Sequence, residues 1–150
     1  MATGKNKVER WIRVWFDDAT PTARDLSGDI VPGSMSGIGG KSFDEVEMTG
    51  ISEAHKNFLS GHWSHQFSCQ FYVNDTASTG AHTVLIAREG AVGTLTIQLG
   101  SGAAPAASDP EWEGEYCLIE CPVVLAGNKP VIAARFIPSG SVAPAWGVYV

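Results

Sequence analysis

Apolar and polar residues alternate with a period of two in several parts of this chain, and this alternation constrains the fold more than any other feature. In residues 43–49, Val46 and Met48 fall on one face and Glu45 and Glu47 on the other. The same alternation returns at Phe67, Cys69, Phe71 and Val73, and again at Leu95, Ile97 and Leu99. A period of two is typical of β-strands buried on one face. The sequence therefore predicts a mostly β fold.

Between residues 49 and 65 the apolar spacing changes to that of a helix. Gly50 ends the first alternation, and Ser52 is a residue type that caps helix N-termini. The apolar residues at helical spacing are Ile51, Ala54, Phe58 and Leu59. Gly61 then stands where a left-handed C-terminal stop is expected. We predict a short helix over residues 52–60, with its apolar stripe, including Phe58, packed on the sheet.

The remaining strands follow from the same pattern and from turn residues. Predicted strands cover residues 8–18, 22–30, 43–49, 65–73, 93–99, 112–125, 131–137 and 146–150, and a second short helix falls within residues 76–87. Pro122 is expected to bend the long strand, because proline favours edges and bulges. These elements predict a β-sandwich or half-barrel of about seven or eight strands with one or two short flanking helices.

Two segments lack any usable period. Residues 1–7 are polar and are expected to form a flexible N-terminal arm, and residues 31–42 form a long glycine-rich loop. Long loops in compact domains are often functional. Part of this loop, Gly39–Ser42, resembles the end of a phosphate-binding loop, but the first glycine of that motif is replaced by Met35. The motif therefore carries no prediction of nucleotide binding.

Composition narrows the class of function. The chain has 150 residues, 44% hydrophobic, which favours a single domain with a real core. Its net charge is −6 with only ten Lys and Arg, which disfavours a phosphate-binding surface. The apolar runs are too short to cross a bilayer. The N-terminus has no apolar signal segment, so we expect synthesis and assembly in a cytosol.

Three cysteines and four histidines raise the question of metal binding or catalysis. Cys69, Cys117 and Cys121 lie in strand-like segments, where buried small apolar residues are expected. With His62 and His65 they match no common zinc spacing. Nothing places a nucleophile beside a base. We expect no metal, no cofactor and no enzyme, although a sugar-binding face lined by tryptophans remains an alternative; its members would be Trp63, Trp112 and Trp146.

Three short motifs resemble the tail tube proteins of long-tailed bacteriophages. They are Glu47-Met48-Thr49-Gly50, Asn57-Phe58-Leu59-Ser60-Gly61 and Phe71-Tyr72-Val73-Asn74-Asp75. The resemblance implies a structural virion protein that forms stacked hexameric rings, with subunits closing an inner β-barrel, in a hollow tube that delivers DNA to the host. It also implies a fold shared with the type VI secretion tube protein, other tail proteins as partners at the tube ends, assembly in the bacterial host cytoplasm, and passage of DNA without specific binding.

If the chain forms a tube, clean polar strand faces are candidates for the channel wall. The lumen-facing candidates are Glu45, Glu47, Thr49, Thr94, Thr96, Gln98, Glu113 and Glu115. Bulky or loop residues are candidates for contacts between subunits or rings: Trp11, Trp15, Val31, Pro32, Met35, Ile38 and Lys41. The alternatives are another virion component, such as a tail terminator or capsid decoration protein, or a soluble β-sandwich module that binds carbohydrate or protein.

Overall fold

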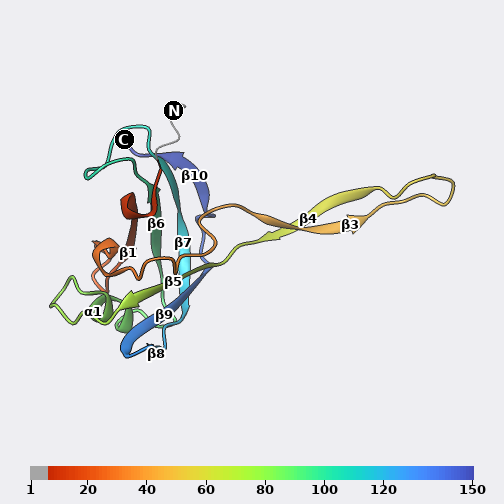
Figure 1. The fold of residues 1–150 in the computed structure, drawn as a ribbon. Coiled ribbons are helices and arrows are strands. Elements are labelled where there is room, and N and C mark those ends of the chain that lie inside the picture. Colours follow the sequence, from red (N-terminus) through yellow and green to blue (C-terminus); the bar gives the residue numbers. More distant parts are fainter. Residues whose placement is uncertain (1–6) are drawn as a thin grey trace.

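The computed structural model describes residues 7–150 and contains two separate sheets (Figure 1). The larger sheet is antiparallel and consists of β1 (Ile12–Asp17), β2 (Ala23–Asp25), β5 (Phe67–Tyr72), β6 (Val92–Leu99), β7 (Pro110–Glu120), β8 (Val123–Ala126), β9 (Lys129–Pro138) and β10 (Ala145–Val148). The smaller sheet is a hairpin of β3 (Ser42–Glu47) and β4 (Phe58–Ser64). The predicted mostly β class with few helices is confirmed.

The helical elements are short. They are the α-helix α1 (Ala81–Ile86) and two 3₁₀ turns, η1 (Glu9–Trp11) and η2 (Ser27–Asp29). Of the predicted N-terminal arm, residues 1–6 lie outside the described residues. Lys7 is described, and its Nζ lies 2.9 Å from the Asp109 carboxylate.

Hydrogen bonding orders the large sheet as β2-β1-β6-β7-β9-β5, with β10 paired to β7 and β8 paired to β9. One face of this sheet and α1 enclose the core. The largest buried side chains are Trp112, Tyr116, Phe16, Phe67, Phe71, Phe136, Leu26, Leu85, Leu95, Ile97, Leu118 and Ile132. These residues recur at every second position in β5, β6, β7 and β9, as the sequence alternation predicts.

Three predicted strands are shorter or divided in the structure. The segment at residues 8–18 begins as the η1 turn and becomes β1 at Ile12. The segment at residues 22–30 contains only β2 and η2. The segment at residues 112–125 divides into β7 and β8 around Pro122, which has no amide hydrogen to continue the ladder.

The predicted helix over residues 52–60 is wrong. Residues 51–57 make the turn at the end of the hairpin, and Phe58 begins β4. The predicted core position of Phe58 is also wrong, because 52% of its surface is exposed. A helix of nine residues is marginal in water without a surface to pack on. Here the chain instead satisfies its backbone by pairing β4 with β3, and Gly61 lies within that strand.

Candidate assembly site: a projecting hairpin and a polar sheet face

The β3–β4 hairpin projects away from the body of the molecule (Figure 1). Its strands pair only with each other, from Ser42↔Ser64 at the root to Glu47↔Phe58 near the tip. Nine residue steps separate Ser42 from the tip at Ile51, which corresponds to about 30 Å of extended chain. An isolated two-stranded hairpin is marginally stable in water at best. The hairpin therefore gains little stability from the rest of its own chain.

Side chains close the tip of the hairpin. The Glu53 carboxylate accepts hydrogen bonds from the Gly50 amide at 3.1 Å and from Asn57 Nδ2 at 2.6 Å. The Asn57 amide donates to Thr49 Oγ1 at 3.0 Å. Ser52, which the sequence suggested as a helix cap, therefore belongs to a turn together with Glu53. Thr49, a predicted lumen residue, is occupied in fixing that turn.

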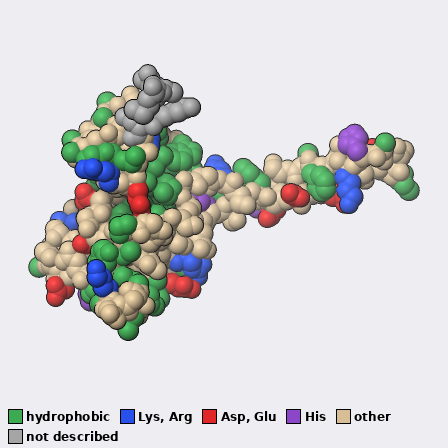
Figure 2. Space-filling model, viewed as in Figure 1, with side chains coloured by type: hydrophobic (Ala, Val, Ile, Leu, Met, Phe, Trp, Pro, Cys, Tyr) green, Lys and Arg blue, Asp and Glu red, His purple; other side chains and the backbone are tan. Residues whose placement is uncertain are grey.

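The two faces of the hairpin differ in chemistry. Val46 pairs with Leu59, and Met48 follows Val46 on the same side by alternation. Phe43 pairs with Trp63 but lies three positions from Val46, so these two rings lie on the opposite face. We call three residues the apolar hairpin face: Val46, Met48 and Leu59. Figure 2 shows hydrophobic side chains along the hairpin surface. Leu59 is 58% exposed and Met48 59% exposed.

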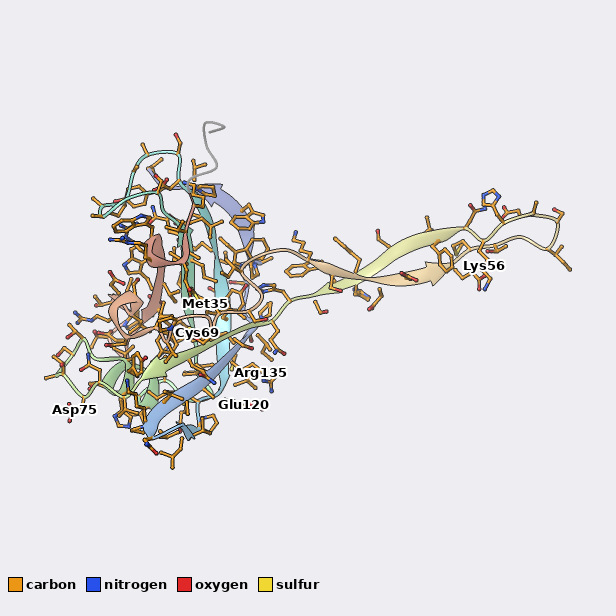
Figure 3. The ribbon with its side chains drawn as sticks, in the orientation of Figure 1. Met35, Lys56, Cys69, Asp75, Glu120 and Arg135 are labelled. Atoms are coloured by element: carbon orange, nitrogen blue, oxygen red, sulfur yellow. The ribbon has the colours of Figure 1, made fainter. Side chains whose placement is uncertain are left out.

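The opposite face of the hairpin carries both glutamates of β3. Glu45 pairs with Ser60, and Glu47 pairs with Phe58. Phe43, Phe58 and Trp63 are the apolar residues of this face. Glu47 lies 4.0 Å from Lys56, which is near the tip in Figure 3, and both side chains are largely exposed. The alternation predicted for residues 43–49 therefore separates Val46 and Met48 from Glu45 and Glu47.

The loop at residues 31–42, predicted to contact other subunits, lies along β5 of its own chain. The Val31 amide donates to the Gln70 carbonyl at 2.9 Å, and Ser36 and Ser68 exchange hydrogen bonds at 2.9 and 3.0 Å. Met35 and Ile38 pack against the core, and Figure 3 places Met35 in the body beside Cys69. This loop covers the free edge of β5. Of the other predicted contact residues, Pro32 is exposed and Lys41 stands over the Trp63 ring at 4.8 Å.

The hairpin is joined to the body through His65, which connects β4 to β5. Its Nε2 lies 2.7 Å from the Gly37 carbonyl oxygen, and its Nδ1 lies 2.7 Å from the Tyr116 hydroxyl. Trp112 Nε1 donates to the same hydroxyl at 2.6 Å. Burial lowers the pKa of His65 below its ordinary value, and hydrogen bonds to backbone carbonyls oppose that shift in part. Sequence reasoning weighed His65 for metal binding or catalysis and did not predict this link to Tyr116.

The second candidate surface is the face of the large sheet opposite the core. Thr96 pairs with Glu113, and Thr96 Oγ1 donates to the Glu113 carboxylate at 3.0 Å. Thr94 pairs with Glu115 in the next row. Four of the predicted lumen residues are thus brought together, whereas Glu45 and Glu47 lie on the hairpin.

Two further residues, Gln98 and Glu111, affect the polarity of this face. Gln98 is fully buried, and its side-chain amide has no hydrogen-bond partner within residues 7–150. Glu111 was missed by sequence reasoning, although its spacing from Glu113 and Glu115 would have identified it. Burial, with Glu113 nearby, raises the pKa of Glu111.

The two predicted contact tryptophans at the start of the chain take separate places. Trp15 pairs with Thr96 and lies on the polar sheet face, where it is half-buried. Trp11 lies in the η1 turn, and the Arg10 guanidinium stacks over its ring at 4.3 Å. Only Trp15 therefore adds an aromatic surface to the polar sheet face.

Of the residues weighed for metal or sugar binding, Cys69, Cys121 and Trp112 are buried, whereas His62 is exposed. Burial raises the pKa values of Cys69 and Cys121 to about 12, so both thiols are protonated at neutral pH. Within residues 7–150 no group of three or more His, Cys, Asp or Glu side chains is placed to hold a metal ion. Trp112 is buried and packs edge-on against Trp146 at 5.3 Å, so these rings form no flat platform for a sugar. The described chain also contains no helix of the length and hydropathy needed to span a bilayer.

Comparisons with known proteins identify the fold. No protein-family model matches the chain, and no curated protein matches it. Among solved structures, the chain is similar to one in the cryo-EM structure of the anti-feeding prophage (AFP) baseplate, 6-fold symmetrised. The TM-score is 0.58 and the identity 16%, over 97% of this chain and 97% of that chain. The class of fold is therefore that of a chain found in this prophage baseplate.

Proposed function

We propose that this chain is a non-enzymatic structural subunit of a phage-tail-like apparatus, in which it forms hexameric rings that stack into a hollow tube. The observation that carries the proposal is the apolar hairpin face, which is uncovered in the single chain. Its three side chains are exposed neighbours in the outer part of an element that reaches about 30 Å from the body. Contiguous exposed apolar surface marks an interaction site. The shared fold with a chain from a 6-fold symmetrised baseplate supports the choice of partner, a further copy of this chain.

The ring geometry explains how such a contact propagates. The hairpin of one copy contacts a different surface of the next, so the interface is heterologous. A heterologous contact closes into a ring when the rotation between copies divides a full turn. The hairpin of each subunit then covers its neighbour, and no apolar hairpin face stays exposed.

The polar surfaces suit a channel wall. With the apolar hairpin face against a neighbour, Glu45 and Glu47 point away from that contact. Thr94, Thr96, Glu113 and Glu115 present a second polar surface on the body. A wall of carboxylates and hydroxyls repels the phosphates of DNA, whereas lysines would bind them and release counterions. We therefore assign these six residues to the lumen of the tube.

Substitutions on the two hairpin faces test the ring contact. Leu59→Asp places a charge on the apolar hairpin face, and burying it in an interface would cost several kcal/mol. Ser60→Asp adds the same charge to the opposite face and is the matched control. We expect negative-stain microscopy to show tubes for wild type and Ser60→Asp and dispersed chains for Leu59→Asp. Circular dichroism should show all three folded. Normal tubes from Leu59→Asp would contradict the role of this face.

A ring at the end of a tube is the second candidate function. It is favoured by the solved structure with the same fold, which is described as a baseplate. A component of this kind forms single rings and does not extend by itself. Microscopy separates the two functions, since long tubes from the purified chain support a tube subunit and isolated rings support a terminal component.

A further inference from the structure

We propose that His65 is a pH-sensitive lock that fixes the direction in which the β3–β4 hairpin leaves the body. The lock belongs to the single chain and does not require assembly. Its consequence for tubes, release at acidic pH, rests on the proposed function.

The hydrogen bonds around His65 define one protonation state. An indole nitrogen only donates, so the Tyr116 hydroxyl accepts from Trp112 Nε1 at 2.6 Å. That hydroxyl then donates its own hydrogen to His65 Nδ1 at 2.7 Å. The Gly37 carbonyl only accepts, so the imidazole hydrogen lies on Nε2. The network is complete only with neutral His65 carrying its hydrogen on Nε2.

This ring connects both legs of the hairpin to the centre of the sheet. Gly37 precedes the outgoing leg, and His65 ends the returning one. Tyr116 and Trp112 belong to β7, which pairs with β6, β9 and β10. Gly37 has a φ of 77°, and a Cβ there would collide with the carbonyl oxygen of Gln66. The two legs are thus in backbone contact at the root, and His65 attaches them to β7 through its hydrogen bond with Tyr116.

Protonation of Nδ1 is incompatible with this arrangement. A hydrogen on Nδ1 would point at the Tyr116 hydroxyl, which would have to turn its own hydrogen away. Tyr116 is fully buried, so that hydrogen would lose its partner without gaining water. Two cations near the ring disfavour a second positive charge there. Lys41 and His65 line the same open cleft of about 620 Å³. Arg135 Nη1 lies 3.4 Å from Oε1 of Gln66, the residue that follows His65.

The other titratable groups near His65 do not change the direction of this pH dependence. Burial raises the pKa of Tyr116 to about 12, so the phenol stays neutral. The carboxylate of Glu120 is paired with Arg135 at 2.8 Å, and Figure 3 shows the two residues close together. Burial lowers the pKa of His65 in the folded chain relative to its ordinary value of 6.5. The stabilisation is therefore fully present above pH 6.5 and is lost as the pH falls through the lower, folded-state pKa.

Hydrogen exchange of the full-length chain tests the lock. We compare pH 7.5 with pH 4.5 after correcting for the intrinsic exchange rate, following peptides that cover residues 36–42 and 64–67. Wild type should lose protection by tenfold or more at pH 4.5, since each pH unit changes the protonated fraction by up to tenfold. His65→Gln keeps a donor and an acceptor but does not titrate, so its protection should be the same at both pH values. His62→Gln, at an exposed position of the same hairpin, is the matched control and should behave like wild type.

Two results would overturn the lock: unchanged protection in wild type, or an equal loss of protection in His65→Gln. If His65→Gln does not fold, nitrogen NMR of wild type decides, because a hydrogen on Nδ1 at pH 7.5 contradicts the network. The measurement is repeated in the Leu59→Asp chain, which is expected to remain unassembled. A chain that never forms rings or tubes but releases its hairpin at pH 4.5 would reject the proposed function and retain the lock. Assembly without pH-dependent release of the hairpin would reject the lock and retain the proposed function.

Discussion

Residues of the same type have different roles in this chain according to where the backbone places them. Phe136 is fully buried, with Phe16 edge-on to its ring at 5.0 Å and Phe67 at 5.9 Å. Phe58 is half-exposed on the hairpin. Phe58 falls in a predicted helix and Phe136 in a predicted strand, so local pattern does not single out Phe58 as exposed. Burial within the single chain decides which one stabilises the fold.

Alanine substitution measures this difference. Phe136→Ala should lower the free energy of unfolding by about 3–5 kcal/mol, because it removes a buried ring and leaves a cavity. Phe58→Ala should change the free energy of unfolding by less than about 1 kcal/mol in the unassembled chain, since this side chain buries little surface there. Urea unfolding of both variants gives the comparison. An equal loss of stability would contradict the hairpin assignment of Phe58.

At the scale of elements, the hairpin and the body are energetically separate. The core contains residues from β1, β5, β6, β7, β9 and α1, and none from β3 or β4. The loop at residues 31–41 is different, because Met35 and Ile38 pack against that core. The hairpin is therefore the part of the chain that is free to serve a partner.

Replacing the hairpin tests this separation. Joining Ser42 to Ser64 through an Asn-Gly turn keeps the paired root and removes the apolar hairpin face. We expect a folded body with a melting temperature within a few degrees of wild type and no tubes by microscopy. Removing residues 32–40 instead exposes the edge of β5 and should lower the melting temperature markedly. Tubes from the shortened hairpin would show that assembly uses another surface.

At the scale of the whole molecule, the sign of the charge decides what passes through a tube. The net charge of −6 gives the subunit a negative field, and the proposed lumen carries Glu45, Glu47, Glu113 and Glu115. Lysine at these positions would bind phosphate and slow its passage, most strongly at low salt. The assembly contact uses the opposite hairpin face, so it should tolerate the change.

Charge reversal of two hairpin residues tests the lumen. Glu45→Lys combined with Glu47→Lys should allow tube assembly but slow the delivery of DNA, with the defect weakening as salt is raised. Asp75→Lys is the control; its exposed loop lies on the side of the body away from the hairpin in Figure 3. The measurement is the rate of DNA release from assembled particles at two salt concentrations. Unimpaired release, with the lysines located in the channel by microscopy, would contradict the electrostatic role of the lumen.

The sequence by itself determined most of the sheet. Period-two alternation located β3, β5, β6 and β9, and glycine and proline located the turns between them, because these are local steric and burial preferences. The same alternation separated Val46 from Glu45 and brought Thr94 and Thr96 to one face.

Only the tertiary structure decided what lies between residues 50 and 65. The spacing of Ile51, Ala54, Phe58 and Leu59 fits a helix, but a short helix there needs a surface to pack on. Strand pairing with β3 forms in its place, because it satisfies the backbone hydrogen bonds of both segments. His65, Tyr116 and Gly37 are far apart in the sequence, and no local pattern predicts that they meet. Their contact depends on the antiparallel pairing of distant strands, which fixes the root of the hairpin and the face it offers to a partner.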